Sequence, residues 1–570
     1  MKRAAFFFCL LLAGLSCKTS GKLADPSQSA SEGSGISSID LDPQKIDDLT
    51  VLGKVWGFLK YYHPAVADGK YDWDRELFKI LPAVLECKTT EKRNKILSAW
   101  IDQLGKVKAG SPEKIDSATV KTYPDLAWID DASLGAELSA KLHEVRRARR
   151  TGENVYASPG VRAANPQFHE EAYAKPAYPD AGLRLLAVYR YWNIIQYHFP
   201  YKYLIGEDWN AVLPEFILKS VKAGSALEYQ LMMRLMIVRI HDSHAGFDSG
   251  DTLMAHYYGR RIVPLQVKFI EGQATVTGYF SSEAGRRSGL KSGDVIRAIN
   301  GKPVSSIVAQ RKAFTWASNN AAELRNIAYD LLRTNDSILQ LRCLRGDSAF
   351  EIRVKSYRPQ QLRSSVPPEP DSAYKLLSPE IGYIHIGTAK RKTISEVMSS
   401  FRNTKGLIID VRCYPSESVL YLLSAHLLPE PKTFVAITYC DYKQPGLFCF
   451  SKTIKAGGKN PDYYKGKVII LVNERTQSAA EFLSMALRTA PRATVIGSTT
   501  SGADGNVSKF TLPGGISTGI SGIGIYYPNG GETQRVGIVP DIEVKPTIKG
   551  IREGRDEVLE KAIALIKVDE

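Results

Sequence analysis

The sequence predicts a multidomain α+β protein with a mostly helical N-terminal domain, a small β domain and a C-terminal α/β domain. The chain has 570 residues, and at about 100–200 residues per domain this length predicts three or four domains. Hydrophobic residues make up 44% and charged residues 24%, which is typical of a globular protein with a real core. The apolar periodicity changes from helical to strand-like near Ile262, and later to alternating strands and helices.

The first residues are typical of a secretory signal. A basic start and an apolar run over residues 4–15 end at Cys17. A cysteine in this place predicts a bacterial lipoprotein in which residues 1–17 are the signal and Cys17 carries the lipid; an ordinary signal with an incidental cysteine is the alternative. We expect export to the bacterial cell envelope and a lipid anchor facing the periplasm, followed by a flexible tether over residues 18–45. The run is too short to span a membrane stably.

Residues 46–258 are expected to form the helical domain, which contains a duplicated unit. Six residues recur at one offset of 136 positions: Trp56/Trp192, Tyr61/Tyr197, Pro64/Pro200, Asp72/Asp208, Trp73/Trp209 and Leu77/Leu213. We interpret these residues as the core of two helical hairpins. An aromatic substrate groove is the alternative interpretation.

Seven cysteines are too few for a disulfide scaffold. Cys440 and Cys449 flank a loop that contains Pro445 and Gly446. Because an exported protein meets an oxidising compartment, a disulfide between these two cysteines is a plausible hairpin staple.

Residues 259–358 are predicted to form the β domain. Apolar residues alternate from Leu265 onward, and the segment 288–304 has a Gly-Asp turn, an apolar strand and an Asn-Gly hairpin turn. This pattern closely resembles the PDZ module. The resemblance implies capture of a peptide C-terminus as an added strand, with Gly289 and Leu290 as substrate-binding candidates.

The net charge of +15 is concentrated in this β domain. Residues 1–258 carry a net charge of +1, residues 259–358 carry +9 and residues 359–570 carry +5. No basic helix or ribonucleoprotein motif accompanies the excess, which disfavours a nucleic-acid binder. A basic module would instead attract negatively charged chain ends by screened steering.

Residues 359–570 form the predicted α/β domain. Short apolar strands are expected at 381–386, 406–411, 468–472 and 494–496, with a helix over 478–487. Ser478 at the start of that helix suits a nucleophile, because nearby backbone N–H groups can stabilise an oxyanion. The alternative is a capping box, in which Ser478 and Glu481 only complete the helix terminus.

The order of the motifs favours the nucleophile. A PDZ-like domain, then a strand ending in Asp410-Val-Arg412, then a strand followed by Thr476-Gln-Ser-Ala-Ala-Glu481, resembles the C-terminal processing, or tail-specific, serine peptidases. The resemblance implies a crotonase-like α/β spiral domain, Ser478 as nucleophile, and an oxyanion hole from the backbone amides of Ala479 and Ser416. Gly502 is a further substrate-binding candidate, and no metal or organic cofactor is implied.

The resemblance also suggests the general base. The stretch 500–506 has no lysine, which disfavours a Ser-Lys dyad. The segment His241-Asp-Ser-His244-Ala-Gly-Phe247 resembles the tricorn-like branch, with His244 as base oriented by Ser243. That branch has a glutamate where this chain has Gln534, which could still hydrogen-bond Ser243; Glu532 is a neighbouring substitute.

Other interpretations stay open. His241, His244 and Asp248 could be metal ligands, although a third well-placed ligand and an activating glutamate are lacking. His244 could also be a structural histidine in a polar core. On the same scaffold the protein could be a non-catalytic peptide- or ligand-binding protein, since the resemblance extends to retinoid-binding proteins. The sequence leaves the substrate and the oligomeric state open.

Overall fold

The computed structural model describes residues 33–110, 115–150, 154–161, 163–362, 373–451 and 453–568. The predicted signal, the lipidation site at Cys17 and the first part of the tether lie outside these residues. The tether prediction is wrong in its last part. The backbone N–H of Ser34 donates to Asp180 Oδ2 at 2.7 Å, and Asp42 caps a helix that begins at Pro43. No helix of the described ranges is long and apolar enough to cross a membrane.

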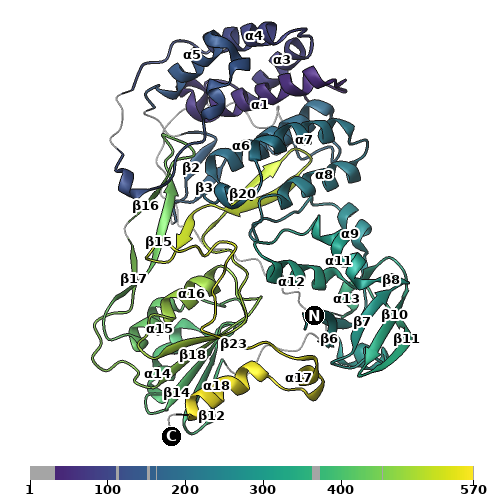
Figure 1. The fold of residues 1–570 in the computed structure, drawn as a ribbon, viewed down its shortest axis with the longest axis vertical. Coiled ribbons are helices and arrows are strands. Elements are labelled where there is room, and N and C mark those ends of the chain that lie inside the picture. The colour runs from purple at the N-terminus through teal and green to yellow at the C-terminus, as the bar shows by residue number, and fades with distance from the viewer. Residues whose placement is uncertain are drawn as a thin grey trace, which may run out of the picture.

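The N-terminal domain is mostly helical, as predicted, with three short strands. The elements are α1 (Pro43–Tyr62), α2 (Pro64–Ala67), α3 (Trp73–Leu85), α4 (Thr90–Gln103), β1 (Val120–Thr122), α5 (Gly135–Arg146), β2 (Ala157–Pro159), β3 (Pro166–Phe168), α6 (Ala181–His198), α7 (Trp209–Lys222), α8 (Ala226–Val238) and α9 (Leu253–Tyr258). Figure 1 shows α1 and α3–α5 as one layer above a second layer of α6, α7 and α8.

The duplicated unit is a pair of helical hairpins, and each hairpin contains the same reciprocal pair of tryptophan hydrogen bonds. In the first, the indole N–H of Trp56 donates to the carbonyl of Trp73 at 3.1 Å, and Trp73 returns the bond at 3.0 Å. In the second, Trp192 and Trp209 make the same reciprocal pair at 2.7 and 3.1 Å. All four side chains are buried. The repeated aromatic residues are therefore core residues, and the groove interpretation is wrong.

Helices α1 and α6 cross closely where α1 carries glycine. A Cβ atom added to Gly57 would lie 1.9 Å from Cγ of Asn193. The Asn193 amide cannot move freely, because it donates to the carbonyls of Gly53 at 3.0 Å and Tyr189 at 2.9 Å. The crossing therefore depends on the missing side chain at Gly57.

We expect Gly57→Ala to lower the free energy of unfolding by about 2 kcal/mol or more, because overpacking forces buried groups apart. Denaturant unfolding measures it. Gly458→Ala is the control, since an added Cβ there meets nothing within 4 Å. Equal losses in the two variants would contradict the close crossing.

In the described residues the middle domain has a six-stranded sheet, the short pair β4-β9 and four helices. Its elements are β4 (Arg261–Ile262), β5 (Leu265–Ile270), β6 (Gln273–Tyr279), α10 (Ser282–Arg287), β7 (Val295–Ile299), β8 (Lys302–Pro303), α11 (Val304–Lys312), α12 (Asn320–Asp330), β9 (Arg333–Thr334), β10 (Ile338–Arg345), β11 (Ser348–Lys355) and α13 (Pro359–Leu362). The strand order is β11-β10-β7-β6-β5, with β8 paired to β7. Asn300 and Gly301 both have positive φ, so the predicted hairpin turn is confirmed.

The C-terminal domain is built on a second six-stranded sheet of order β12-β13-β14-β18-β19-β23, parallel except for β12. The predicted strands and helix are confirmed to within two residues. The elements are β12 (Tyr374–Ser378), β13 (Ile381–His385), α14 (Ile394–Ser400), β14 (Gly406–Asp410), α15 (Leu420–Leu427), β18 (Lys467–Val472), α16 (Ala479–Leu487), β19 (Ala493–Gly497), β23 (Ile542–Glu543), α17 (Ile548–Glu553) and α18 (Glu557–Lys567). Helices α14–α16 pack on one face, and α18 covers the other.

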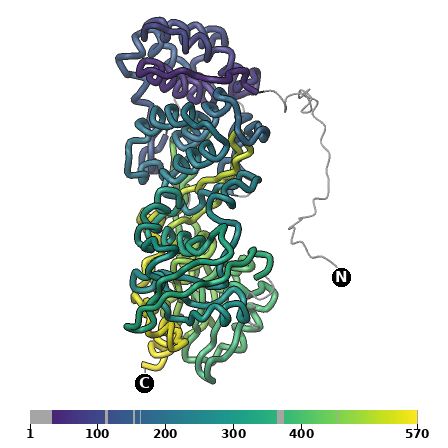
Figure 2. The backbone as a smooth tube through the Cα atoms, turned by 90° about the vertical axis from the view of Figure 1, so that its right-hand side faces the viewer, coloured from purple at the N-terminus to yellow at the C-terminus, as the bar shows by residue number. Residues whose placement is uncertain are grey.

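A hairpin from the C-terminal domain enters the helical domain. It consists of β20 (Val507–Leu512) and β21 (Ile516–Ser521), paired antiparallel. Its residues Phe510, Leu512, Ile516 and Ile520 belong to the core of the helical domain. Figures 1 and 2 show this yellow segment running up beside α6 and away from the rest of its domain. The N- and C-terminal domains are therefore packed into one unit, and residues 277 positions apart meet there.

The remaining strands form a smaller sheet, β1-β16-β15-β17 with β22 paired to β15. The strands are β15 (Lys432–Cys440), β16 (Phe448–Phe450), β17 (Ile454–Ala456) and β22 (Gly524–Tyr526). Both Cys440 and Cys449 are free thiols. Cys449 stands opposite Tyr439 rather than Cys440, so the two thiols point to opposite faces of the hairpin. The disulfide expectation is wrong for that reason.

Candidate active site

Ser478 has a strained backbone between β18 and α16. Its φ of 57° and ψ of −119° lie outside the extended region that an N-cap residue normally adopts. Such a conformation costs about 1–3 kcal/mol and persists only where its surroundings hold it. Here the Ser478 N–H donates to the carbonyl of Ala503 at 2.9 Å and to Glu481 Oε2 at 3.0 Å.

The buried carboxylate of Glu481 holds two chain segments together. Besides Ser478, it accepts the backbone N–H groups of Gly502 at 2.8 Å and Ala503 at 3.1 Å, and the hydroxyl of Thr500. Burial raises the pKa of Glu481, and these four donors oppose that rise. Glu481 therefore does more than complete a helix terminus, because it fixes the serine to the 500–503 loop.

The two expected oxyanion donors differ in their surroundings. Ala479 is exposed and is the first residue of α16, where a backbone N–H has no partner within the helix. The N–H of Ser416 instead donates to the carbonyl of Ile386 at 3.3 Å, and its hydroxyl donates to Ala389. In this conformation the N–H of Ala479 is at an exposed helix start, whereas the amide of Ser416 is already used.

His244 lies in the loop after α8, with only 5% of its side chain exposed. Its Nδ1 lies 2.8 Å from the hydroxyl of Ser521 at the end of β21. Its Nε2 is buried without a hydrogen-bond partner. Burial lowers the pKa of His244, and the carboxylate of Asp242 opposes that shift. The imidazole is thus a neutral ring in which Nδ1 has a hydrogen-bond partner and Nε2 has none.

Ser478 and His244 are joined through their neighbours rather than directly. Gln477 Nε2 donates to the carbonyl of Ser243 at 3.4 Å, and the hydroxyl of Ser243 donates to the carbonyl of Ser501 at 3.3 Å. Because His244 Nε2 has no partner, the serine–histidine hydrogen bond is not formed in this conformation. In unliganded peptidases such bonds are often long and tighten when substrate binds.

The metal interpretation gains no support from the described residues, where no group of three His, Cys, Asp or Glu side chains could hold an ion. Asp248 is exposed and pairs with Ser517 through its backbone. Burial lowers the pKa of His241, and neighbouring arginines lower it further.

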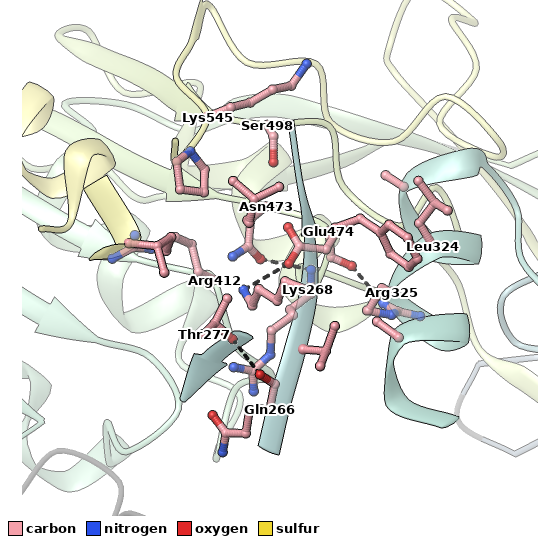
Figure 3. Close-up of a pocket in the computed structure, with 18 of the residues that line it drawn as sticks. Gln266, Lys268, Thr277, Leu324, Arg325, Arg412, Asn473, Glu474, Ser498 and Lys545 are labelled. Carbon is pink, nitrogen blue, oxygen red and sulfur yellow. Dashed lines mark hydrogen bonds and ion pairs between the residues drawn. The ribbon is translucent and has the colours of Figure 1, made fainter. Parts of the chain in front are cut away.

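A cavity of about 910 Å³ lies between the middle and C-terminal domains. Strand β5 and helix α12 form one wall (Figure 3). The C-terminal domain lines the rest with Arg412, the start of the loop that carries Ser478, Ser498, and residues from Val544 into α18. Lys268 of β5 pairs with Glu474 at 3.0 Å, and Arg325 of α12 donates to the carbonyl of Glu474 at 2.8 Å. In the described residues β5 is the end strand of its sheet, and its residues 265–270 line the cavity.

Comparison with known proteins identifies the C-terminal domain. Residues 380–544 match the model of peptidase family S41. The chain carries a domain of peptidase family S41. It is 25% identical over 325 residues to the carboxy-terminal processing protease CtpB of Bacillus subtilis (strain 168). That alignment covers 53% of this chain and 58% of CtpB, so the chain spans less than two thirds of that relative.

The fold around the S41 domain also matches solved structures. Mature CPAF in complex with lactacystin superposes with a TM-score of 0.54 at 16% identity, over 68% of this chain and 98% of CPAF. A second structure of mature CPAF gives a TM-score of 0.53 at 17% identity, over 68% of this chain and 97% of that chain. At these identities the likeness shows a shared fold.

The hydrogen bonds that were predicted to orient His244 differ from those in the structure. The Ser243 hydroxyl accepts from the Ser318 N–H at 2.8 Å and does not contact the imidazole. Gln534 Nε2 donates to Asp242 Oδ1 at 3.3 Å and to Ser318 Oγ at 3.5 Å, not to Ser243. Glu532 pairs with Lys121 at 2.7 Å, which removes it as a substitute.

The substrate-binding expectations are also corrected. Leu290 is 1% exposed in the core of the middle domain, and Gly289 lies in the turn before β7, where its carbonyl accepts from Arg345. Neither lines the cavity. Gly502 is buried and serves the Glu481 network. These glycines have positive φ, so turn geometry explains them without a substrate.

Proposed function

We propose that the protein is a serine peptidase that cleaves peptides or unfolded protein tails in the bacterial cell envelope. Ser478 is the nucleophile, His244 the general base, and the middle domain a PDZ-like module beside a crotonase-like spiral. One observation carries the proposal above the others. A serine with φ of 57° stands at the first turn of a helix inside an S41 domain, and strain of this kind gathers at functional sites.

The proposed chemistry gives each of these groups one role. His244 Nε2 takes the hydroxyl proton as Ser478 Oγ attacks the scissile carbonyl, and the Ala479 N–H donates to the oxyanion. The protonated imidazole then gives that proton to the leaving amine, which leaves an acyl-enzyme on Ser478. Water deprotonated by His244 hydrolyses the ester and restores the serine.

The cavity beside β5 supports capture of a substrate tail. An extended peptide can add to the free edge of β5 as a further strand, with its side chains directed toward α12. The middle domain carries a net charge of +9, which favours approach of a terminal carboxylate. Glu474 at the start of the Ser478 loop lines the cavity, so a tail bound there would lie beside that loop.

The place of the protein in the cell is part of the proposal. A basic start, an apolar run and Cys17 favour export and a lipid anchor facing the periplasm. Palmitate labelling of cells that express the chain measures this directly. Label that is lost in Cys17→Ala supports the anchor, and equal label in both chains contradicts it.

Filling the cavity should weaken tail binding without affecting the nucleophile. We expect Ala321→Trp on α12, which lines the cavity, to raise KM for a tail-bearing polypeptide by about tenfold or more. Ala309→Trp on the exposed face of α11 is the matched control. An unchanged KM in Ala321→Trp would place the tail elsewhere.

The pH profile should reflect the burial of His244. Because burial lowers its pKa below the ordinary value of 6.5, the imidazole remains a neutral base in mildly acidic solution. We expect the acid limb of kcat/KM below pH 6.5 and a plateau through neutrality. An acid limb above pH 7 would contradict His244 as the base.

Incubation of the mature chain with an unfolded, tail-bearing polypeptide tests the function itself. New termini that accumulate with time, and that are absent with Ser478→Ala, support the peptidase. Binding of the polypeptide without cleavage would favour a non-catalytic binding protein on the same scaffold.

A further inference from the structure

A buried carboxylate that the proposed mechanism does not use lies two residues before His244. Asp242 is fully buried and accepts four hydrogen bonds. The donors are the Ser521 N–H at 2.6 Å, the Ser521 hydroxyl at 3.0 Å, the His244 N–H at 2.9 Å and Gln534 Nε2 at 3.3 Å. A buried charge with this many donors is costly to build and is not explained by packing alone.

We propose that Asp242 and Ser521 are the positioning residues of His244, with the carboxylate acting on the imidazole through the serine hydroxyl. This inference rests on the proposed function and names how its base is held. His244 Nδ1, Ser521 Oγ and Asp242 Oδ1 form a chain with links of 2.8 and 3.0 Å. The direct distance from His244 Nδ1 to Asp242 Oδ1 is 4.0 Å, so the hydroxyl is the link.

The direction of the protons in this chain follows from the donor inventory. A carboxylate only accepts, and a serine hydroxyl has one proton. Ser521 gives that proton to Asp242, so its oxygen accepts from His244 Nδ1–H. The imidazole is therefore held in the tautomer with a bare Nε2, which is the nitrogen that lacks a partner and that must take the proton of Ser478.

Gln534 fits the same arrangement because it is neutral. Its side-chain N–H donates to Asp242 Oδ1, and it is 1% exposed. A glutamate there would bring a second buried carboxylate against the first, and two such groups cannot both ionise cheaply. The negative charge of the site is thus carried at Asp242 and not at position 534.

The surroundings of His244 leave Asp242 as its charged neighbour. The groups that hydrogen-bond to the 242–244 segment from other elements are uncharged: Ser521 on β21, Ser318 before α12, Gln477, the carbonyl of Ser501, and Gln534. The titratable groups near Asp242 are Tyr191 and Tyr201, and burial raises the pKa of both phenols, which keeps them neutral. Asp242 opposes the lowering of the His244 pKa by burial. Loss of that carboxylate therefore lowers the pKa of the imidazole further and weakens it as a base.

Asp242→Asn and Ser521→Ala in the full chain test the proposal, with Asp248→Asn as the matched control. Asp248 is an exposed carboxylate four residues from His244. Two readouts are needed: the pH profile of kcat/KM, and the pKa of His244 from NMR of ring-labelled histidine, assigned with His244→Gln. Circular dichroism verifies that each variant is folded.

We expect Asp242→Asn to lower kcat/KM about 10³-fold or more, as loss of a tautomer-holding carboxylate does elsewhere, with the acid limb and the His244 pKa moved to lower pH. Ser521→Ala should lower kcat/KM about 10–100-fold, and Ser521→Thr should restore most of it. Asp248→Asn should match the parent.

An unchanged His244 pKa in Asp242→Asn overturns the proposal, as does a rate loss with no change in the pH profile. The NMR readout needs no turnover. A chain without peptidase activity whose His244 pKa still falls in Asp242→Asn would therefore refute the proposed function and support the positioning role. If Asp242→Asn fails to fold, Ser521→Ala decides by the same two measurements.

Discussion

Ser478→Ala is expected to reduce kcat/KM by roughly 10⁴-fold or more while the chain remains folded. Loss of the nucleophile in a serine peptidase removes the acyl-enzyme route and leaves only binding and the oxyanion donors. The substitution keeps the backbone contacts of residue 478, because the bonds to Ala503 and Glu481 use its N–H. Steady-state hydrolysis of an unfolded polypeptide measures the rate, and denaturant unfolding measures the stability.

Two matched variants make that result specific. Ser399→Ala, on the exposed face of α14, should match the parent in rate. Ser478→Gly should be as inactive as Ser478→Ala. Its free energy of unfolding should be about 1 kcal/mol higher than that of Ser478→Ala, because glycine accepts a positive φ without strain. A Ser478→Ala chain that retained more than about a tenth of the rate would contradict the assignment of the nucleophile.

Glu481→Ala is expected to be the most destabilising single change in the site. It leaves the backbone N–H groups of Gly502 and Ala503 and the Thr500 hydroxyl without their acceptor, whereas the Ser478 N–H keeps its bond to the carbonyl of Ala503. At about 1–3 kcal/mol for each buried group left unpaired, the loss should reach at least 3–5 kcal/mol. Domains of this kind are stable by only about 5–15 kcal/mol, so the variant should unfold at much lower denaturant and lose its activity.

The comparison for Glu481 needs a conservative and a distant variant. Glu481→Gln keeps one acceptor oxygen and should lose less stability than Glu481→Ala. Glu396→Ala, on the exposed face of α14, should change the free energy of unfolding by less than about 0.5 kcal/mol. An unfolding midpoint of Glu481→Ala equal to that of Glu396→Ala would mean that the carboxylate does not hold the serine loop.

Local patterns predicted the elements well and singled out Ser478 as the candidate nucleophile. Alternating apolar residues predicted β5, and the apolar run before Ser478 predicted β18. Both predictions succeed because the periodicity of a strand depends only on residues that are neighbours in the sequence. The offset of 136 positions located both reciprocal tryptophan pairs. The Thr476–Glu481 motif makes Ser478 a candidate, although the strained φ that distinguishes it from an ordinary cap is visible only in three dimensions.

The orientation of His244 could not be predicted in the same way. Its partner Ser521 lies 277 positions along the chain, on a hairpin whose entry into the helical domain has no signal in sequence. Asp242 stands within the motif that contains His244, and a buried acid two residues from a candidate base was the available clue. Leu290 was assigned to substrate from the resemblance of its segment to the PDZ module, and tertiary packing places it in the core instead.

Labelling with a fluorophosphonate, read by intact mass and peptide mapping, tests the central claim most directly because it needs no knowledge of the substrate. We predict one adduct per chain, on the peptide that contains Ser478. The adduct should be lost in Ser478→Ala, strongly slowed in His244→Gln and unchanged in Ser399→Ala. A parent chain that remains unmodified, or an adduct on another residue that persists in Ser478→Ala, would contradict Ser478 as an activated nucleophile.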